Sequence, residues 1–155
     1  MFDKPLNVGR RFNSCCVDLD SEEFRRWFES SVKTLGSAER DIAAGDFSWA
    51  CFKAHQAVEK ALKAFLWGIG KPTFGHSLIK LVEKMFEVSG GRVEWVADNC
   101  MRLDKYYTAT RYPDVWESGF PEEYFSKGEA EEAVERAAKI VKWVKAVWMS
   151  LSGGV

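Results

Sequence analysis

Apolar side chains recur every three to four residues along most of this chain, which is the period of an amphipathic α-helix. The first predicted helix covers residues 20–44, and its apolar face is formed by Phe24, Trp27, Phe28, Val32, Leu35 and Ile42. Asp20 and Glu23 have the spacing of a capping box, and Gly45 suits the helix exit. The sequence therefore predicts both ends of this helix.

The same period predicts four further helices. They cover residues from about 46 to 68, 76 to 88, 92 to 111 and 128 to 151. The helix at 92–111 must end near Tyr112, because a residue that precedes proline avoids the helical region. Residues 112–127 then form a long loop. No segment alternates with a period of two, so we predict an all-α, up-and-down bundle of about five helices, with one domain at residues 20–152 and an N-terminal arm at 1–19.

The second predicted helix has two unlike faces. Its apolar face is formed by Cys51, Ala54, Val58, Ala61, Leu62 and Phe65. At 100° per residue, an arc of about 80° on the opposite side holds Lys53, Gln56, Lys60 and Lys63. This lysine stripe could bind phosphate. It could equally be an ordinary solvated face, supported by a pair between Glu59 and Lys63 at i, i+4.

Composition and charge narrow the classes of function. The net charge is −1, whereas a domain that binds DNA without regard to sequence is usually basic. The four cysteines do not cluster with the two histidines, so we expect no metal site, and no motif implies a cofactor. Cys51 and Cys100 fall on apolar helical positions and should be buried thiols. No signal peptide or membrane-length apolar run is present, so we expect a cytoplasmic protein without membrane association.

The stretch YYTATRYPDVW at residues 106–116 is the best candidate for a binding site. It places Arg111 at a helix end, beside the turn that Pro113 imposes. A guanidinium binds phosphate in a bidentate manner and stacks on aromatic rings. The predicted ligand-binding residues at this helix end are Tyr106, Arg111, Tyr112 and Asp114. Alternatively, Arg111 pairs with Asp114 or Glu117 and holds the loop, with Asp114 capping the turn.

The two histidines are further candidates. His55 precedes Glu59 by four residues, and a histidine oriented by a carboxylate can shuttle protons. His55 also fits a half-buried position at the edge of the core. His76 stands at the start of the third predicted helix, where it should cap or pack. No catalytic signature such as HExxH or GxSxG occurs, and no catalytic residue is assigned.

Three segments together resemble the HEPN family, whose name stands for higher eukaryotes and prokaryotes nucleotide-binding. They are AHQAVEKALKA at 54–64, GHSL at 75–78 and RYPD at 111–114, and the resemblance extends over about residues 22–148. It implies an up-and-down bundle of four main helices plus a short extra one. It also implies a homodimer and, in many members, a separate small nucleotidyltransferase partner in a toxin–antitoxin module.

The ribonuclease members of this family carry an arginine followed, after four to six residues, by a histidine. Arg111 matches the arginine, but residues 112–118 contain no histidine. The resemblance therefore implies a non-catalytic module of RYPD type, in a toxin–antitoxin or stress-response system. It would bind a nucleotide or RNA phosphate through Arg111 and the lysine stripe, beside a nucleotidyltransferase partner.

Two other functions stay open. One is an atypical metal-independent ribonuclease that uses Arg111 with Tyr106, Tyr112 or His55. The other is a purely structural domain for dimerisation or partner binding. Its contact surface would be the long loop, which carries Trp116, Phe120, Tyr124 and Phe125.

Overall fold

The computed structural model describes residues 18–153. Its α-helices are α1 (Ser21–Ala44), α2 (Phe47–Gly68), α3 (Leu78–Ser89), α4 (Glu94–Asp104), α5 (Tyr106–Ala109) and α6 (Lys127–Leu151). Two single turns of 3-10 helix, η1 (Pro113–Val115) and η2 (Pro121–Glu123), lie between α5 and α6. No strand occurs in this range, which confirms the all-α class. The predicted arm lies outside the described residues except for its last two.

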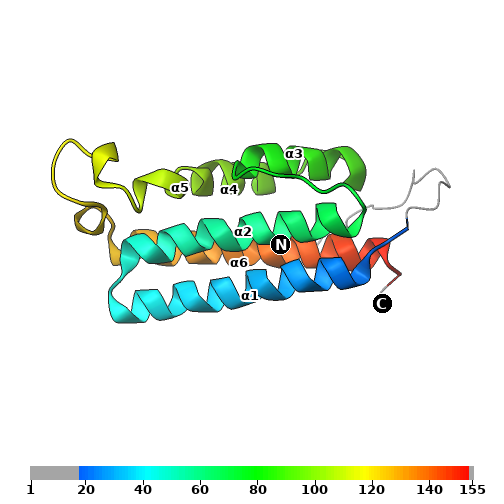
Figure 1. Cartoon of the computed structure of the whole chain (residues 1–155), viewed down its shortest axis with the longest axis horizontal. Helices are drawn as coiled ribbons and strands as arrows, with labels where there is room; N and C mark the ends of the chain where they lie inside the picture. Colours follow the sequence, from blue (N-terminus) through cyan, green and yellow to red (C-terminus); the bar gives the residue numbers. More distant parts are fainter. Residues whose placement is uncertain (1–17, 154–155) are drawn as a thin grey trace, which may run out of the picture.

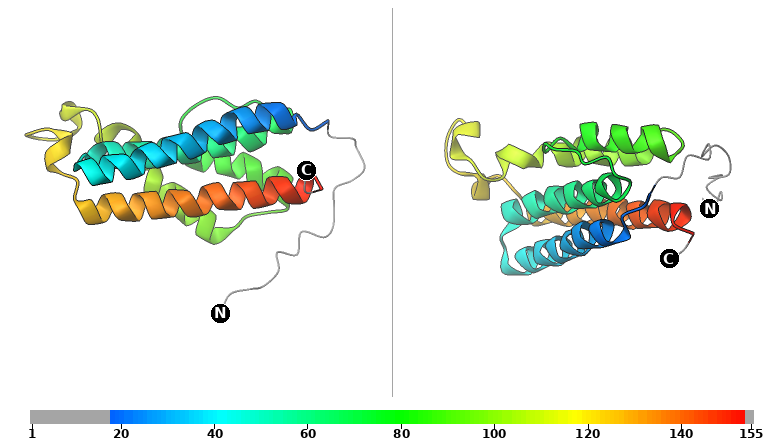
Figure 2. Two further views of the ribbon diagram at one scale, coloured as in Figure 1. Left: turned by 90° about the horizontal axis from the view of Figure 1, so that it is seen from below. Right: turned by 45° about the vertical axis from the view of Figure 1, so that its right-hand side comes forward.

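The long helices lie side by side along one axis, in layers (Figures 1 and 2). The segment α3–α5 forms one side of the bundle, α2 and α6 lie in the middle, and α1 lies on the opposite side. α1 and α2 are joined by a tight turn at Gly45, whose φ of 84° is the left-handed conformation expected at a helix exit. No helix within residues 18–153 has the length and apolar character needed to cross a membrane.

The start of α1 differs in one detail from the predicted capping box. Asp20 accepts a hydrogen bond from the backbone N–H of Glu23 at 2.9 Å, as expected. The Glu23 carboxylate, however, accepts from the indole of Trp27 at 3.1 Å. The backbone N–H of Asp20 donates instead to the carbonyl of Gly68 at 2.7 Å. The first turn of α1 is thus capped by Asp20 and is also joined to the end of α2.

The helix α2 is the centre of the fold, and this corrects the prediction of a solvated lysine face. Fifteen of its 22 residues are buried, because α1, α3, α4, α5 and α6 all pack against it. Its alanines let the neighbouring helices approach closely, and five of them have no exposed surface. A helix surrounded in this way has little solvated surface, so most of its polar residues find partners inside the protein.

The predicted helix at 92–111 is divided at Lys105 into α4 and the single turn α5. Beyond α5, the chain enters the loop at 112–127, which folds back onto the bundle. The indole of Trp116 donates to the carbonyl of Ala109 at 2.8 Å, and its ring stacks on Tyr124 with centroids 3.9 Å apart. Phe125 is buried. Of the four aromatic residues predicted as a contact surface, Phe120 and Tyr124 are exposed.

Cys51 and Cys100 are buried free thiols, as predicted. Burial, together with the negative charge of Glu129, raises the pKa of Cys51 to about 12. Burial and the charge of Asp104 raise the pKa of Cys100 to about 12 as well. Both groups remain protonated at neutral pH and act as small apolar side chains in the core.

Candidate functional site

The Arg111 side chain lies among aromatic rings just beyond the end of α5. Its Cζ atom is 4.1 Å from the ring centre of Phe52 and 4.9 Å from the ring centres of both Tyr107 and Tyr112. Its Nε donates to the backbone carbonyl of Tyr107 at 3.0 Å, and Nη2 donates to the same oxygen. The guanidinium is therefore fixed in place by the rings and by its own helix end.

The same guanidinium has no counter-ion among residues 18–153. Neither Asp114 nor Glu117 forms an ion pair with it, so the predicted alternative of an Arg111–carboxylate pair is not observed. Asp114 is exposed in η1 and makes no cap hydrogen bond. A half-buried cation that is positioned but not neutralised is a group that can receive an anion.

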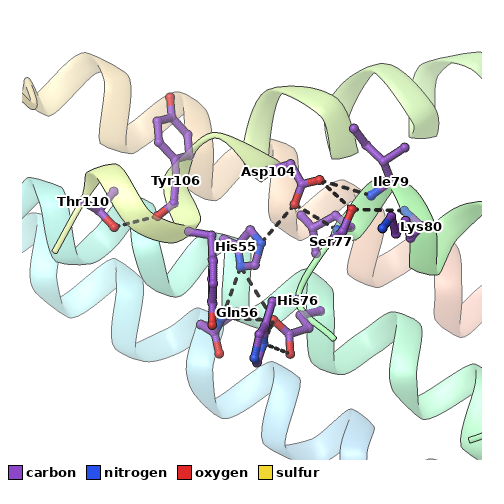
Figure 3. Close-up of polar contacts among 12 residues, drawn as sticks. His55, Gln56, His76, Ser77, Ile79, Lys80, Asp104, Tyr106 and Thr110 are labelled. Carbon is purple, nitrogen blue, oxygen red and sulfur yellow. Dashed lines mark hydrogen bonds and ion pairs between the residues drawn. The ribbon is translucent and has the colours of Figure 1, made fainter. Parts of the chain in front are cut away.

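The structure brings His76 and Glu59 together. The His76 Nδ1 lies 3.1 and 3.2 Å from the two carboxylate oxygens of Glu59, and Figure 3 shows this contact beside His55. The imidazole stacks on Tyr107 with centroids 4.6 Å apart and a 17° angle between the planes. Because an ionised carboxylate only accepts hydrogen bonds, Nδ1 carries the proton and Nε2 is left for an external partner. The His76 side chain is 53% exposed, whereas that of Glu59 is 7% exposed.

The buried Glu59 carboxylate also balances the charge of Lys63. It accepts from Lys63 Nζ at 2.8 Å, as the i, i+4 spacing predicted, and from the Gln56 amide at 3.2 Å. Its contact with His55 is weaker, at 3.9 Å to Nδ1. The sequence thus suggested the wrong histidine as the main partner of Glu59. The partner histidine belongs to the GHSL segment, which was noted only for its family resemblance and which ends a loop that returns along α2 (Figure 1).

His55 has a different environment and is fully buried. Its Nε2 lies 3.3 Å from Asp104 Oδ1, and its Nδ1 lies 3.2 Å from the Gln56 amide. The predicted half-buried position is therefore wrong, because α4 covers this face of α2. Without exposed surface, His55 has no route to a ligand, which removes it as a proton shuttle for Arg111.

Asp104, which sequence reasoning missed, joins α2, α3 and α4. It accepts from the backbone N–H of Leu78 at 2.9 Å and of Ile79 at 3.4 Å, and from the hydroxyl of Ser77 at 3.1 Å (Figure 3). Burial alone would raise the pKa of Asp104, but the hydrogen bonds from His55, Leu78, Ile79 and Ser77 outweigh it and lower that pKa. Asp104 thereby fixes the start of α3, and with it the segment that carries His76.

The lysine stripe does not form one surface. Lys53 Nζ lies 2.7 Å from Asp41 and 3.0 Å from the hydroxyl of Ser37, and Lys60 Nζ donates to Thr34 at 2.9 Å. These two lysines are therefore occupied by α1. Gln56 and Lys63 reach the Glu59 carboxylate instead, on the side that contacts His76. The sequence left open whether these four residues share one cleft with Arg111, and the packing divides them between α1 and the Glu59 carboxylate.

Tyr106 lies on the other side of α5 from Arg111. Figure 3 shows its ring directed away from His55 and His76. Its hydroxyl donates to Glu129 at 3.0 Å, and burial together with that carboxylate raises the pKa of Tyr106 well above its ordinary value. It lines an open cavity of about 630 Å³ between α4–α5 and α6, whose wall includes Trp116. The predicted ligand group at the helix end is thus divided, with Arg111 and Tyr112 together and Tyr106 apart.

Comparisons with known proteins agree on one family. The family model described as HEPN domain matches residues 24–147. The crystal structure of TT1696 from Thermus thermophilus is similar to this chain at 36% identity and a TM-score of 0.77, covering 81% of this chain and 98% of that one. ST0689, described as an archaeal HEPN homologue, is similar at 32% identity and a TM-score of 0.67, covering 79% and 95% of the two chains.

A third solved structure is an HEPN domain protein (tm0613) from Thermotoga maritima. It is similar to this chain at 28% identity and a TM-score of 0.64, and the match covers 79% of this chain and 97% of that one. No curated protein sequence matches this chain significantly. The three structural matches cover nearly the full length of their own chains, so the likeness concerns the whole bundle and not a fragment of it.

Proposed function

The chain belongs to the HEPN domain family, and on this premise we propose that it is a non-catalytic module that binds the phosphate of a nucleotide or of RNA at Arg111. The observation that carries the proposal is the guanidinium itself. It is held by three aromatic rings and one carbonyl, yet it has no carboxylate partner within residues 18–153. Phosphate, like carboxylate, is an anion whose geometry fits a guanidinium in a bidentate manner.

The groups around Arg111 favour an anionic ligand with a flat ring. The hydrogen bonds to the Tyr107 carbonyl use the Nε–H and one N–H of Nη2, which leaves both N–H groups of Nη1 and the second N–H of Nη2 for the ligand. Tyr112 is 47% exposed beside it and offers a face for a base. His76, which stacks on the same Tyr107 ring, adds the free Nε2 of its imidazole. The site therefore offers one charge, one imidazole and one exposed aromatic ring within a small area.

The partners in this proposal rest on family membership alone. They are a second copy of the chain and a small nucleotidyltransferase, in a toxin–antitoxin or stress-response system of the cytoplasm. Phe120 and Tyr124, which remain exposed in the loop at 112–127, are the residues that such a partner would contact. The shift in oligomer mass when both are replaced by alanine tests this part of the proposal.

One observation favours a second function, metal-independent cleavage of RNA. His76 is oriented by the buried Glu59 and shares the Tyr107 ring with Arg111. In such a cleavage, His76 Nε2 takes the proton of a 2′-hydroxyl, the 2′-oxygen bonds to the adjacent phosphorus, and the bond from phosphorus to the 5′-oxygen breaks. The leaving 5′-oxygen takes a proton from water, and Arg111 stabilises the charge that develops on the phosphate. Cleavage of an RNA substrate in the presence of EDTA, abolished in His76→Ala and in Arg111→Ala, would support this function over simple binding.

The binding function is tested by titrating the protein with ATP, other nucleotides and a short RNA whose 2′-hydroxyls are methylated. Arg111→Ala should weaken binding about 10- to 100-fold, because hydrogen bonds to a charged group contribute about 1.5–3 kcal/mol. Arg25→Ala is the matched control, since Arg25 is an exposed arginine already paired with Glu29 at 3.3 Å. Absence of binding at millimolar concentration, or equal affinity of Arg111→Ala and the wild type, would contradict the proposal.

A further inference from the structure

The open cavity between α4–α5 and α6 is not lined by Arg111 and has no part in the proposed phosphate site. Its volume is about 630 Å³, within the range of sites that hold small molecules. Two hydrogen bonds join its walls. The Tyr106 hydroxyl donates to Glu129 at 3.0 Å, and Arg136 Nη1 donates to the side-chain oxygen of Asn99. These bonds are seven residues apart on each side, or about 10 Å along a helix. The walls are therefore held in place before any ligand enters.

Each wall of this cavity is one face of a helical segment. Residues spaced at i, i+3, i+4 and i+7 lie on one face of a helix. The cavity is lined at this spacing by Arg102, Lys105, Tyr106 and Ala109 on one side, and by Glu129, Glu132, Ala133 and Arg136 on the other. The backbone stays in the right-handed helical region at Lys105, where α4 passes into α5. The segment α4–α5 and the helix α6 thus present one continuous face each to the same space.

Aromatic rings form part of the lining. The buried Phe125 ring meets the ring of Tyr106 at 5.9 Å and 69°, and that of Trp116 at 5.9 Å and 89°. We call Tyr106, Trp116 and Phe125 the three-ring wall. The Trp116 indole N–H is taken by the carbonyl of Ala109, and the Tyr106 hydroxyl by Glu129. Because its polar atoms already have partners, the three-ring wall offers ring surface to a flat apolar group.

The charged side chains of the cavity leave a positive excess. They are the cations Arg102, Lys105 and Arg136 and the carboxylates Glu129 and Glu132. Arg136 is paired with Glu132. Arg102 and Lys105 are exposed and form no ion pair within residues 18–153. Because they are three residues apart on the same face, one anionic group can reach both of them.

We propose that this cavity binds a small aromatic carboxylic acid, whose ring lies against the three-ring wall and whose carboxylate contacts Arg102 and Lys105. The single negative charge of such a ligand matches the positive excess. A phosphate monoester carries about 1.5–2 negative charges at neutral pH and would stand close to Glu129 and Glu132, so it fits less well. The proposal is independent of phosphate binding at Arg111, from which it differs in both the residues and the ligand.

The test compares 2-naphthylacetate with its neutral amide, 2-naphthylacetamide, which lacks the charge. NMR titrations of isotope-labelled protein follow the tryptophan indole N–H signals, and Trp116→Phe identifies the Trp116 signal by its loss. The variants are Arg102→Gln combined with Lys105→Gln, Arg111→Ala and Lys84→Gln. Lys84 is the matched control, since it is exposed on α3 and likewise forms no ion pair in the described part of the chain. Circular dichroism verifies that each variant keeps its helices.

The wild type should bind 2-naphthylacetate with a dissociation constant on the order of 1 mM or lower, with a shift of the Trp116 signal. It should bind the amide at least about fivefold more weakly, because the amide offers no charge to the two cations. The double variant should bind acid and amide equally, whereas Arg111→Ala and Lys84→Gln should bind the acid as the wild type does.

Three results would overturn the proposed acid site directly. They are the absence of a saturable shift at Trp116, equal affinity of the wild type for acid and amide, and a preference for the acid that persists in the double variant. Loss of acid binding in Arg111→Ala would assign the acid to the other face of α5, and loss in Lys84→Gln would show that the contact is non-specific. Either of these would overturn the site as well. None of these failures bears on nucleotide binding at Arg111, which has its own titration.

Discussion

Replacing Asp104 by alanine removes the acceptor of four hydrogen bonds that join three helices. These bonds come from His55 in α2, from Ser77 and from the first two backbone N–H groups of α3. Loss of a side-chain acceptor at a helix start costs about 1 kcal/mol. Leaving a buried donor such as His55 without a partner costs about 1–3 kcal/mol more. We therefore expect Asp104→Ala to lower the free energy of unfolding by about 2–4 kcal/mol.

The same carboxylate should contribute a pH-dependent part of the stability. The pKa of Asp104 is lower in the folded protein than its ordinary value of 3.8. A group with a depressed folded pKa stabilises the fold fully above its unfolded pKa, and this contribution is lost as the pH falls through the folded pKa. Wild-type stability should therefore decrease below about pH 4 more steeply than that of Asp104→Asn, which has no carboxylate to protonate.

Urea unfolding followed by tryptophan fluorescence measures both effects, at pH 7 and in steps below pH 4. Asp98→Ala is the control, because Asp98 is an exposed aspartate of the same helix, and its replacement should stay within about 0.5 kcal/mol of the wild type. For a domain of this size, the expected loss in Asp104→Ala corresponds to a decrease in Tm of about 4–16 °C. A decrease in unfolding free energy no larger than that of the control would refute the assignment of Asp104 as the link between the helices.

Two further predictions concern the interior of the bundle. Glu59→Gln should lower the free energy of unfolding by about 3 kcal/mol or more in the same urea assay, because it leaves the buried Lys63 without its carboxylate at 2.8 Å. A double variant that also carries Lys63→Met should recover most of this loss. No recovery would argue against the buried pair. Gly68→Ala should lower the free energy of unfolding by about 1–3 kcal/mol through overpacking, since a Cβ there would lie 2.6 Å from the Trp148 ring. Gly128→Ala is the control and should be tolerated, because a Cβ at that position would meet nothing within 4 Å. Equal Tm values for the two glycine variants would contradict this packing.

The helices themselves were predictable from the sequence, because the period of apolar residues is a local property. Phe24 and Trp27 are three residues apart, and side chains at that spacing lie on one face of a helix, as they do in α1. The burial of Cys51 and Cys100 was predictable in the same way, because both occupy apolar positions of the helical period. The likeness of the GHSL and RYPD segments to HEPN sequences also identified the family correctly, since such motifs are read directly along the chain.

The candidate site, in contrast, was decided by contacts between segments that lie far apart in the chain. The period of apolar residues shows which residues share a face of a helix, but it does not show which neighbouring helix covers that face. Lys53 and Lys60 were therefore predicted to lie on a solvated face, although side chains of α1 bind them. The pairing of Glu59 with His76 spans 17 residues and a loop, and no repeat in the sequence marks it. The unpaired state of Arg111 is likewise a result of packing, because the side chains that the fold brings around its guanidinium are aromatic rings and not carboxylates.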